Sequence, residues 1–106
     1  MKKGARIVAD VEITYTETES KGRYVATTPE AGGEAELTTS KVTPTLFIAD
    51  HTFVPDSMRG MGVARMLVDR LIDDARRRGE RIVPLCPFVR AHALKHREEL
   101  ADVIQW

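Results

Sequence analysis

The glycine-containing loop Arg59-Gly60-Met61-Gly62-Val63-Ala64 has the residue types best suited to ligand binding in this chain. We expect it between a strand and the first turn of an amphipathic helix, where free backbone N–H groups and the helix dipole attract anions. Gly60 and Gly62 would let the backbone approach a phosphate, and Arg59 could add a charge-assisted hydrogen bond. The loop has neither a Walker ending nor the three glycines of a dinucleotide fingerprint. From these residues alone it is either an anion site or a plain connecting turn.

A second chemical pattern is the pair His92 and His96, whose four-residue spacing is one used for zinc. Position 93 is Ala where a metalloprotease would carry a Glu base, and no further Cys or His stands at ligand spacing. We therefore expect no metal site. Lys95 and His96 are instead expected near a helix end, facing a cofactor or solvent.

Composition limits the classes of protein that this chain can belong to. Its 106 residues suit one domain with one core, spanning residues 1–106, and its 16 basic and 16 acidic residues lack the excess of positive charge of a general nucleic-acid binder. Cys86 is the only cysteine, which fits a reducing, cytoplasmic setting. The apolar stretch after the basic start is too short for a signal peptide, and no stretch is long enough to span a membrane.

The elements expected to position the loop begin with strands. Val11, Ile13 and Tyr15 alternate with polar residues, which predicts a strand with one wet face. Pro29 and Gly32-Gly33 are expected to end the hairpin that follows. Residues 45–54 are almost continuously apolar or β-favouring, as expected of a central strand covered on both faces. The predicted strands comprise residues 11–16, 23–28, 35–42, 45–54 and 81–86.

Helical periodicity begins at Gly62, with Val63, Leu67 and Leu71 on one face, and Gly79 is a good C-terminal stop. The strand–helix–strand order over residues 45–86 predicts a right-handed βαβ unit with its two strands parallel. Ligands of such units lie beyond the carboxyl ends of the strands. Residues 88–104 favour a second helix. Its expected core contacts are Leu94, Leu100, Val103 and Ile104.

At the loop, the chain resembles the GNAT superfamily of N-acetyltransferases, whose acetyl-CoA loop reads Arg/Gln-x-x-Gly-x-Gly/Ala; the matching residues are Arg59, Gly62 and Ala64. His51-Thr52-Phe53-Val54 before the loop and Val83-Pro84-Leu85-Cys86 after the helix extend the likeness. The arrangement looks like the minimal single-domain YjdJ-type branch and covers about residues 5–104.

Two positions depart from that branch. Phe88 stands where Tyr is expected, and Arg97 stands where that branch often has the Pro that breaks its last helix. The resemblance therefore leaves open whether the last helix is broken at this position.

The resemblance implies a GNAT-like α/β fold, with a mixed sheet of about five strands, a βαβ crossover and two or three helices. It implies acetyl-CoA as co-substrate, with the main chain of Phe53 and Val54 pairing with the pantetheine arm. The loop amides would hold the pyrophosphate. The implied cofactor-binding residues are Phe53, Val54, Arg59, Gly60, Met61, Gly62, Val63, Ala64, Phe88, Lys95 and His96.

Acetyl transfer to an amine needs a base for the amine, and an acid for the departing thiolate. In this interpretation His51 is the candidate base, because imidazole exchanges protons near neutral pH. Cys86 is the candidate acid or, alternatively, a transient nucleophile. Structural alternatives stay open for both: a free cysteine is usually buried, and a histidine at a strand end often bonds a carbonyl.

We therefore expect an acetyl-CoA-dependent N-acetyltransferase whose acceptor is an amine of a small molecule or a protein, with no nucleic acid or membrane partner. The alternative is a non-catalytic acyl-CoA-binding module, and a third is an interaction module that docks a partner through its first strands. The basic run Arg76-Arg77-Arg78 could reach the adenosine 3′-phosphate, or it could simply complement the helix dipole. The sequence gives no indication of oligomeric state.

Overall fold

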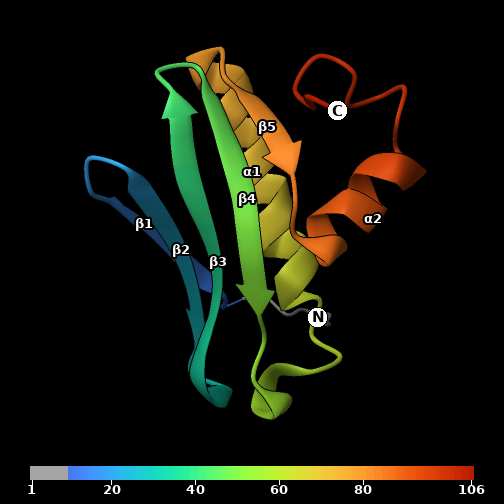
Figure 1. Cartoon of the computed structure of the whole chain (residues 1–106). Helices are drawn as coiled ribbons and strands as arrows, with labels where there is room; N and C mark the ends of the chain where they lie inside the picture. The colour runs from blue at the N-terminus through green and yellow to red at the C-terminus, as the bar shows by residue number, and fades with distance from the viewer. Residues whose placement is uncertain (1–9) are drawn as a thin grey trace.

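The chain forms one five-stranded mixed sheet in the order β1-β2-β3-β4-β5 (Figure 1), in a computed structural model that describes residues 10–106. The strands are β1 (Glu12–Glu17), β2 (Lys21–Thr28), β3 (Ala31–Thr43), β4 (Leu46–Phe53) and β5 (Arg81–Pro84). The helices are α1 (Val63–Arg78) and α2 (Pro87–Lys95), and a 3-10 turn η2 (Asp56–Met58) follows β4. The first four strands pair antiparallel and β4 pairs parallel with β5. The predicted mixed sheet with a βαβ unit is thus confirmed.

The hairpin of β1 and β2 follows the predicted alternation. Ile13 pairs with Ala26 and Tyr15 with Tyr24, so these four side chains share the face that enters the core. Pro29 follows the end of β2 as predicted, but Gly32-Gly33 lies inside β3, which begins at Ala31 after a two-residue connection. The period-two pattern therefore located the buried face correctly.

Helix α1 covers one face of the sheet and produces the core (Figure 1). Its apolar stripe is buried, including Val63, Leu67 and Leu71, and Gly79 ends it at a φ of 68° as predicted. The prediction that residues 45–54 are covered on both faces is wrong. In β4 only Phe47 and Ala49 are buried, because α1 packs on their side and no helix of residues 10–106 covers the other face.

The predicted helix over residues 88–104 ends at Lys95. Residues after it turn back to β5: Ile82 N–H donates to the Val103 carbonyl at 2.7 Å and Gln105 N–H to the Ile82 carbonyl at 2.8 Å. These bonds satisfy backbone groups of β5 that a continuous helix would leave bare. Leu94, predicted to be in the core, is 45% exposed, whereas Leu100, Val103 and Ile104 are buried as predicted.

Two observations concern predictions about the chain as a whole. Over residues 10–106, no helix has the length and apolar character required to cross a membrane. The prediction that the chain start is not a signal peptide concerns residues 1–9, which lie outside the described residues.

Candidate functional site

The parallel pair β4–β5 opens into a fork. Pairing ends at Ala49 and Pro84, and the chain then leaves β5 to begin α2. The Cys86 N–H closes the fork by donating to the Ala49 carbonyl at 2.8 Å. Beyond this point β4 continues to Phe53 with β3 on one edge only, and within residues 10–106 nothing bonds the backbone of its other edge. A free strand edge of this kind can pair with an extended ligand.

Cys86 lies at the base of the fork. Its side chain is 3% exposed, and its Sγ is 3.2 Å from the Thr52 hydroxyl. Thr52 pairs with the buried Leu37, so its side chain points to the α1 face of the sheet. Sequence reasoning missed Thr52, because simple alternation from the buried Ala49 would place it on the opposite face.

A β-bulge in β4 decides where His51 lies. The pairing with β3 shifts between Thr39–Ala49 and Thr38–His51, which leaves Asp50 as an extra residue. His51 consequently sits opposite Thr38 on the open face, and it is exposed. His51 and Cys86, expected around one crevice, are therefore on opposite sides of the sheet, with the free edge of β4 between them.

The loop before α1 presents open backbone donors. Gly60 and Gly62 have φ values of 82° and 73°, a left-handed region that favours glycine. Among the described residues, no side chain caps Gly62, and nothing lies within 4 Å of a Cβ built at either glycine. The amides of Gly60 and Gly62 through Arg65 find no acceptor within residues 10–106. Open donors at the positive end of the α1 dipole would attract an anion, and the helix carries no acidic residue in its first turn.

Not every part of the loop is open. The Arg59 amide donates to the Asp56 carbonyl at 3.1 Å and the Met61 amide to the Met58 carbonyl at 3.3 Å, so two of the amides expected to hold a pyrophosphate are already used. The Arg59 guanidinium forms an exposed ion pair with Asp56. Val63 is buried, and Ala64 lies in the first turn of α1.

The remaining predicted residues divide into two groups. Phe53 and Phe88 are 51% and 42% exposed, at the end of β4 and in the first turn of α2, and Val54 is packed against the core. These three lie near the fork. Lys95 and His96 lie at the other end of α2, about 12 Å further along at 1.5 Å per residue.

His92 and His96 face α1 rather than the fork. Their rings are 4.6 Å apart and line a cavity of about 190 Å³ with Arg65 and Glu99. Burial first, and then the Arg65 charge, lowers the pKa of His92. His96 Nδ1 is 3.3 Å from a Glu99 oxygen. Within residues 10–106, His, Cys, Asp and Glu side chains form no group of three that could hold a metal ion.

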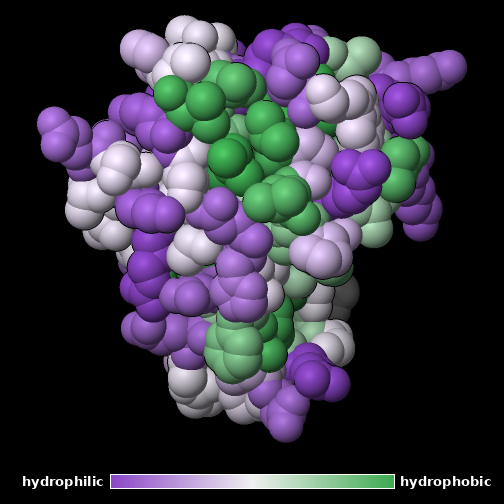
Figure 2. All heavy atoms as spheres, in the orientation of Figure 1, coloured by the Kyte–Doolittle hydropathy of each residue, from purple (hydrophilic) through white to green (hydrophobic). Residues whose placement is uncertain are grey.

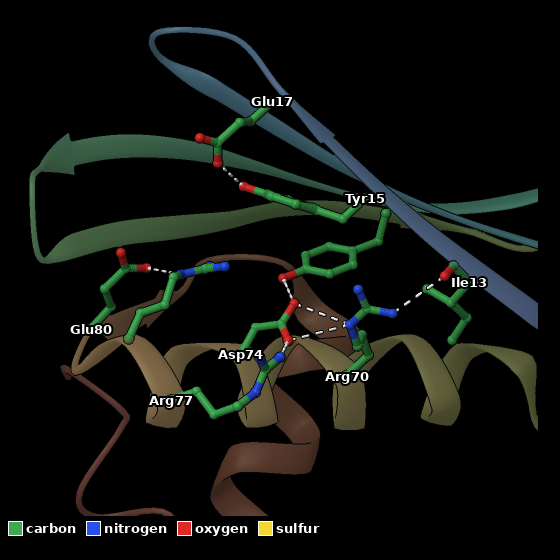
Figure 3. A network of polar contacts seen from close by, with 9 residues as sticks. Ile13, Tyr15, Glu17, Arg70, Asp74, Arg77 and Glu80 are labelled. Carbon is green, nitrogen blue, oxygen red and sulfur yellow. Dashed lines mark hydrogen bonds and ion pairs between the residues drawn. The ribbon is translucent and has the colours of Figure 1, made fainter.

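The opposite end of α1 carries a polar network that sequence reasoning did not foresee (Figure 3). Asp74 is 2% exposed and accepts hydrogen bonds from the Tyr24 hydroxyl at 2.7 Å and from Arg70 Nε at 3.1 Å; Arg77 pairs with it as well. Burial alone would raise the pKa of Asp74, but the bonds from Tyr24 and Arg70 outweigh it and hold that pKa below its usual range. Burial and Asp74 together raise the pKa of Tyr24.

The three basic residues at the end of α1 are also engaged. Arg76 pairs with Asp102, Arg77 with Asp74, and Arg78 with Glu80. They lie about 20 Å from Gly62 along the helix, because 13 or more residues intervene at 1.5 Å each. The basic run thus forms ion pairs near the C-terminal end of α1 and lies far from the loop.

Comparisons with known proteins identify the family and the fold. The profile of the family described as GCN5-related N-acetyl-transferase matches residues 23–103. A GCN5-like candidate N-acetyltransferase from Staphylococcus aureus, solved by NMR in solution, is similar to this chain with a TM-score of 0.64 and 28% identity, over 92% of this chain and 90% of that one. No curated protein sequence matches the chain significantly.

Proposed function

Because the chain belongs to the GCN5-related N-acetyltransferase family, we propose that it transfers an acetyl group from acetyl-CoA to an amine. The observation that carries this proposal is the fork: a free edge of β4 leads from the open amides of the loop to the buried Cys86 sulfur. One extended ligand with a diphosphate at one end and a thioester at the other would bind the loop amides and reach the Cys86 sulfur.

The cofactor contacts follow from the placement of the residues. Amides of Gly60, Gly62, Val63 and Ala64 would bind the diphosphate, and the main chain of Phe53 and Val54 would pair with the pantetheine arm. The exposed rings of Phe53 and Phe88 would cover that arm. Lys95 and His96, at the far end of α2, would reach only the distal part of the molecule.

The chemistry divides between the two sides of the sheet. His51, on the open face, would take a proton from the attacking amine as its nitrogen bonds the carbonyl carbon. As the carbon–sulfur bond breaks, the Cys86 thiol would give its proton to the leaving sulfur, and the Thr52 hydroxyl would hold the thiol in position. Solvent then returns the proton from His51 to Cys86. In the covalent alternative, the Cys86 sulfur attacks the thioester carbonyl, the carbon–sulfur bond to CoA breaks, and CoA leaves as a thiol with the proton from Cys86. The amine then takes the acetyl group from Cys86 and gives its proton, through His51, to the released Cys86 sulfur.

Calorimetry with acetyl-CoA, together with CoA release in the presence of a panel of amines, tests the proposal. We expect His51→Ala and Cys86→Ser to leave the acetyl-CoA affinity within about twofold and to lower turnover by about a hundredfold or more. Mass spectrometry of protein incubated with acetyl-CoA distinguishes the two roles of Cys86, since only the covalent alternative leaves an acetyl adduct on that residue.

Thr52 offers a sharper variant. Thr52→Val keeps the shape of the side chain but removes the hydroxyl, and we expect turnover to fall about tenfold with unchanged affinity. Thr14→Val, an exposed threonine of β1, is the control. Equal effects of the two substitutions would contradict the role assigned to Thr52.

The burial of Cys86 favours one other function, a non-catalytic acyl-CoA-binding module. Its thiol is 3% exposed and already contacts Thr52, as expected of a structural cysteine. In that case acetyl-CoA still binds, but no amine is acetylated and neither His51→Ala nor Cys86→Ser has a functional effect.

A further inference from the structure

The open face of the sheet holds a shallow hollow of about 480 Å³, a size typical of small-molecule sites. Figure 2 shows this face: polar side chains cover its middle, below an apolar patch over the upper ends of the central strands. The hollow crosses the sheet from Thr16 on β1 to Asp50 on β4. It belongs to none of the cofactor contacts described above.

The hollow leads to His51. Thr16 pairs with Arg23, Arg23 with Thr38, and Thr38 with His51, so four side chains form one row across β1 to β4. Thr16, Arg23 and Thr38 line the hollow, and His51 is the next residue in the row. A molecule lying in the hollow would therefore extend toward His51 and the fork.

Two opposite charges in the hollow share one hydroxyl. The Lys21 ammonium donates to Ser40 Oγ at 2.7 Å, and Ser40 Oγ donates to an Asp50 carboxylate oxygen at 2.5 Å. Neither Lys21 nor Asp50 forms an ion pair within residues 10–106, whereas Arg23 is neutralised by its carboxylate partners. The hollow thus presents one unpaired cation beside one unpaired anion, which is the complement of a zwitterion.

Resting on the proposed function, we propose that this hollow binds the acceptor, and that the acceptor is a free amino acid with a second amine on its side chain. Its α-carboxylate lies at Lys21 and its α-ammonium at Asp50. Strands are about 4.8 Å apart, so one to two strand spacings, about 5–10 Å, separate Ser40 from the free edge of β4. A side chain of three or four methylenes spans that distance and brings its terminal amine to His51.

The acceptor panel that tests this contains L-lysine, L-ornithine and cadaverine, which has two amines but no carboxylate. We expect kcat/KM for lysine or ornithine to exceed that for cadaverine at least tenfold, because only the amino acids pair with Lys21. In Lys21→Met the advantage should disappear, because kcat/KM for lysine and ornithine falls to the level of cadaverine. Equal kcat/KM values for cadaverine and lysine in the wild-type protein would overturn the proposal.

Lys41→Met is the matched control. Lys41 is on the neighbouring strand and pairs with Phe47; like Lys21 it borders the cavity beside Tyr15 and Phe47, but unlike Lys21 it does not line the hollow. It should therefore leave the preference for lysine intact. Asp50→Asn should lower kcat/KM for lysine about tenfold or more. Equal losses in Lys41→Met and Lys21→Met would contradict the assignment.

Direct binding separates this inference from the proposed transfer reaction. Lysine titrated into the wild-type protein without acetyl-CoA should shift the amide resonances of residues around Ser40 and Thr38, and Lys21→Met should lose these shifts. If lysine binds in this way while no amine is acetylated, the binding site stands and the transfer proposal fails. If acetyl transfer occurs but lysine produces no shifts on the open face, the site assignment fails.

Discussion

The two ends of α1 differ in whether their polar groups have hydrogen-bond partners within the protein. At the C-terminal end, Asp74 is buried and bonded to Tyr24, Arg70 and Arg77, and the helix closes on Gly79. At the N-terminal end, the amides of Gly60 and of residues 62–65 have no acceptor among the described residues, and space is open around both glycines. Polar groups that the protein satisfies itself hold the helix on the sheet. Those left open are the ones available to a ligand.

Removing the buried carboxylate should have the largest effect. Asp74→Ala leaves the buried Tyr24 hydroxyl without its acceptor and removes the partner of two more exposed arginines, and we expect the free energy of unfolding to fall by about 2–3 kcal/mol in urea titrations. Acetyl-CoA affinity of the folded variant should stay within about twofold. The exposed neighbour Asp73→Ala is the control, with an expected change below about 0.5 kcal/mol. A comparable loss at Asp73 would remove the contrast between the two ends.

The glycines at the two ends of α1 can be compared at equal backbone strain. Gly62 and Gly79 flank α1 with φ values of 73° and 68°, and a Cβ at either meets nothing within 4 Å. Gly62→Ala and Gly79→Ala should therefore each lose about 1–2 kcal/mol of stability. Only Gly62→Ala should also weaken acetyl-CoA binding, about tenfold by calorimetry, because its methyl group would enter the space before the open amides. Equal affinities in the two variants would show that the loop does not bind the diphosphate.

The Tyr24 hydroxyl should contribute less than the carboxylate it serves. Tyr24→Phe leaves Asp74 with its two arginines, so we expect a loss of about 1 kcal/mol in urea titrations. Tyr15 bonds the exposed Glu17 instead, and Tyr15→Phe should cost less than about 0.5 kcal/mol. A larger loss in Tyr15→Phe would place the key contact at the edge of the sheet.

The smallest expected effect is the pH dependence of the stability that Asp74 contributes. The pKa of Asp74 is lower in the folded protein than the usual 3.8, so its contribution to stability is complete above about pH 4 and is lost as the pH falls through the folded value. Unfolding free energies of wild type and Asp74→Asn, compared between about pH 6 and pH 3, should converge on acidification. A difference that grows toward acid would contradict the direction of the shift.

Local patterns predicted the elements that depend on neighbours in the chain. The helical period located α1, Gly79 ended it, and the loop of residues 59–64 lies before α1 as expected, with Gly62 as its N-cap. Alternation likewise identified the buried sides of β1 and β2. The roles of the predicted site residues remain proposals, but the positions of Cys86, Phe53 and Val54 at the fork follow from that same order of elements.

Pairing between distant segments decided what those patterns missed. The last predicted helix stopped at Lys95, because residues 103–105 bond to β5. The covered central strand proved open on one side, because the helices did not supply a second layer there. Neither outcome has a local signature, since each depends on which backbone groups another segment satisfies.

The amino-acid sequence by itself determined a βαβ unit with a glycine-bearing loop before its helix, because hydrophobic period and glycine conformations act over a few residues. Only the tertiary structure decided that one extra residue, Asp50, turns His51 to the open face and brings Thr52 to the sulfur of Cys86. The physical reason is that a bulge arises from the register of two strands, and register is a property of the paired sheet.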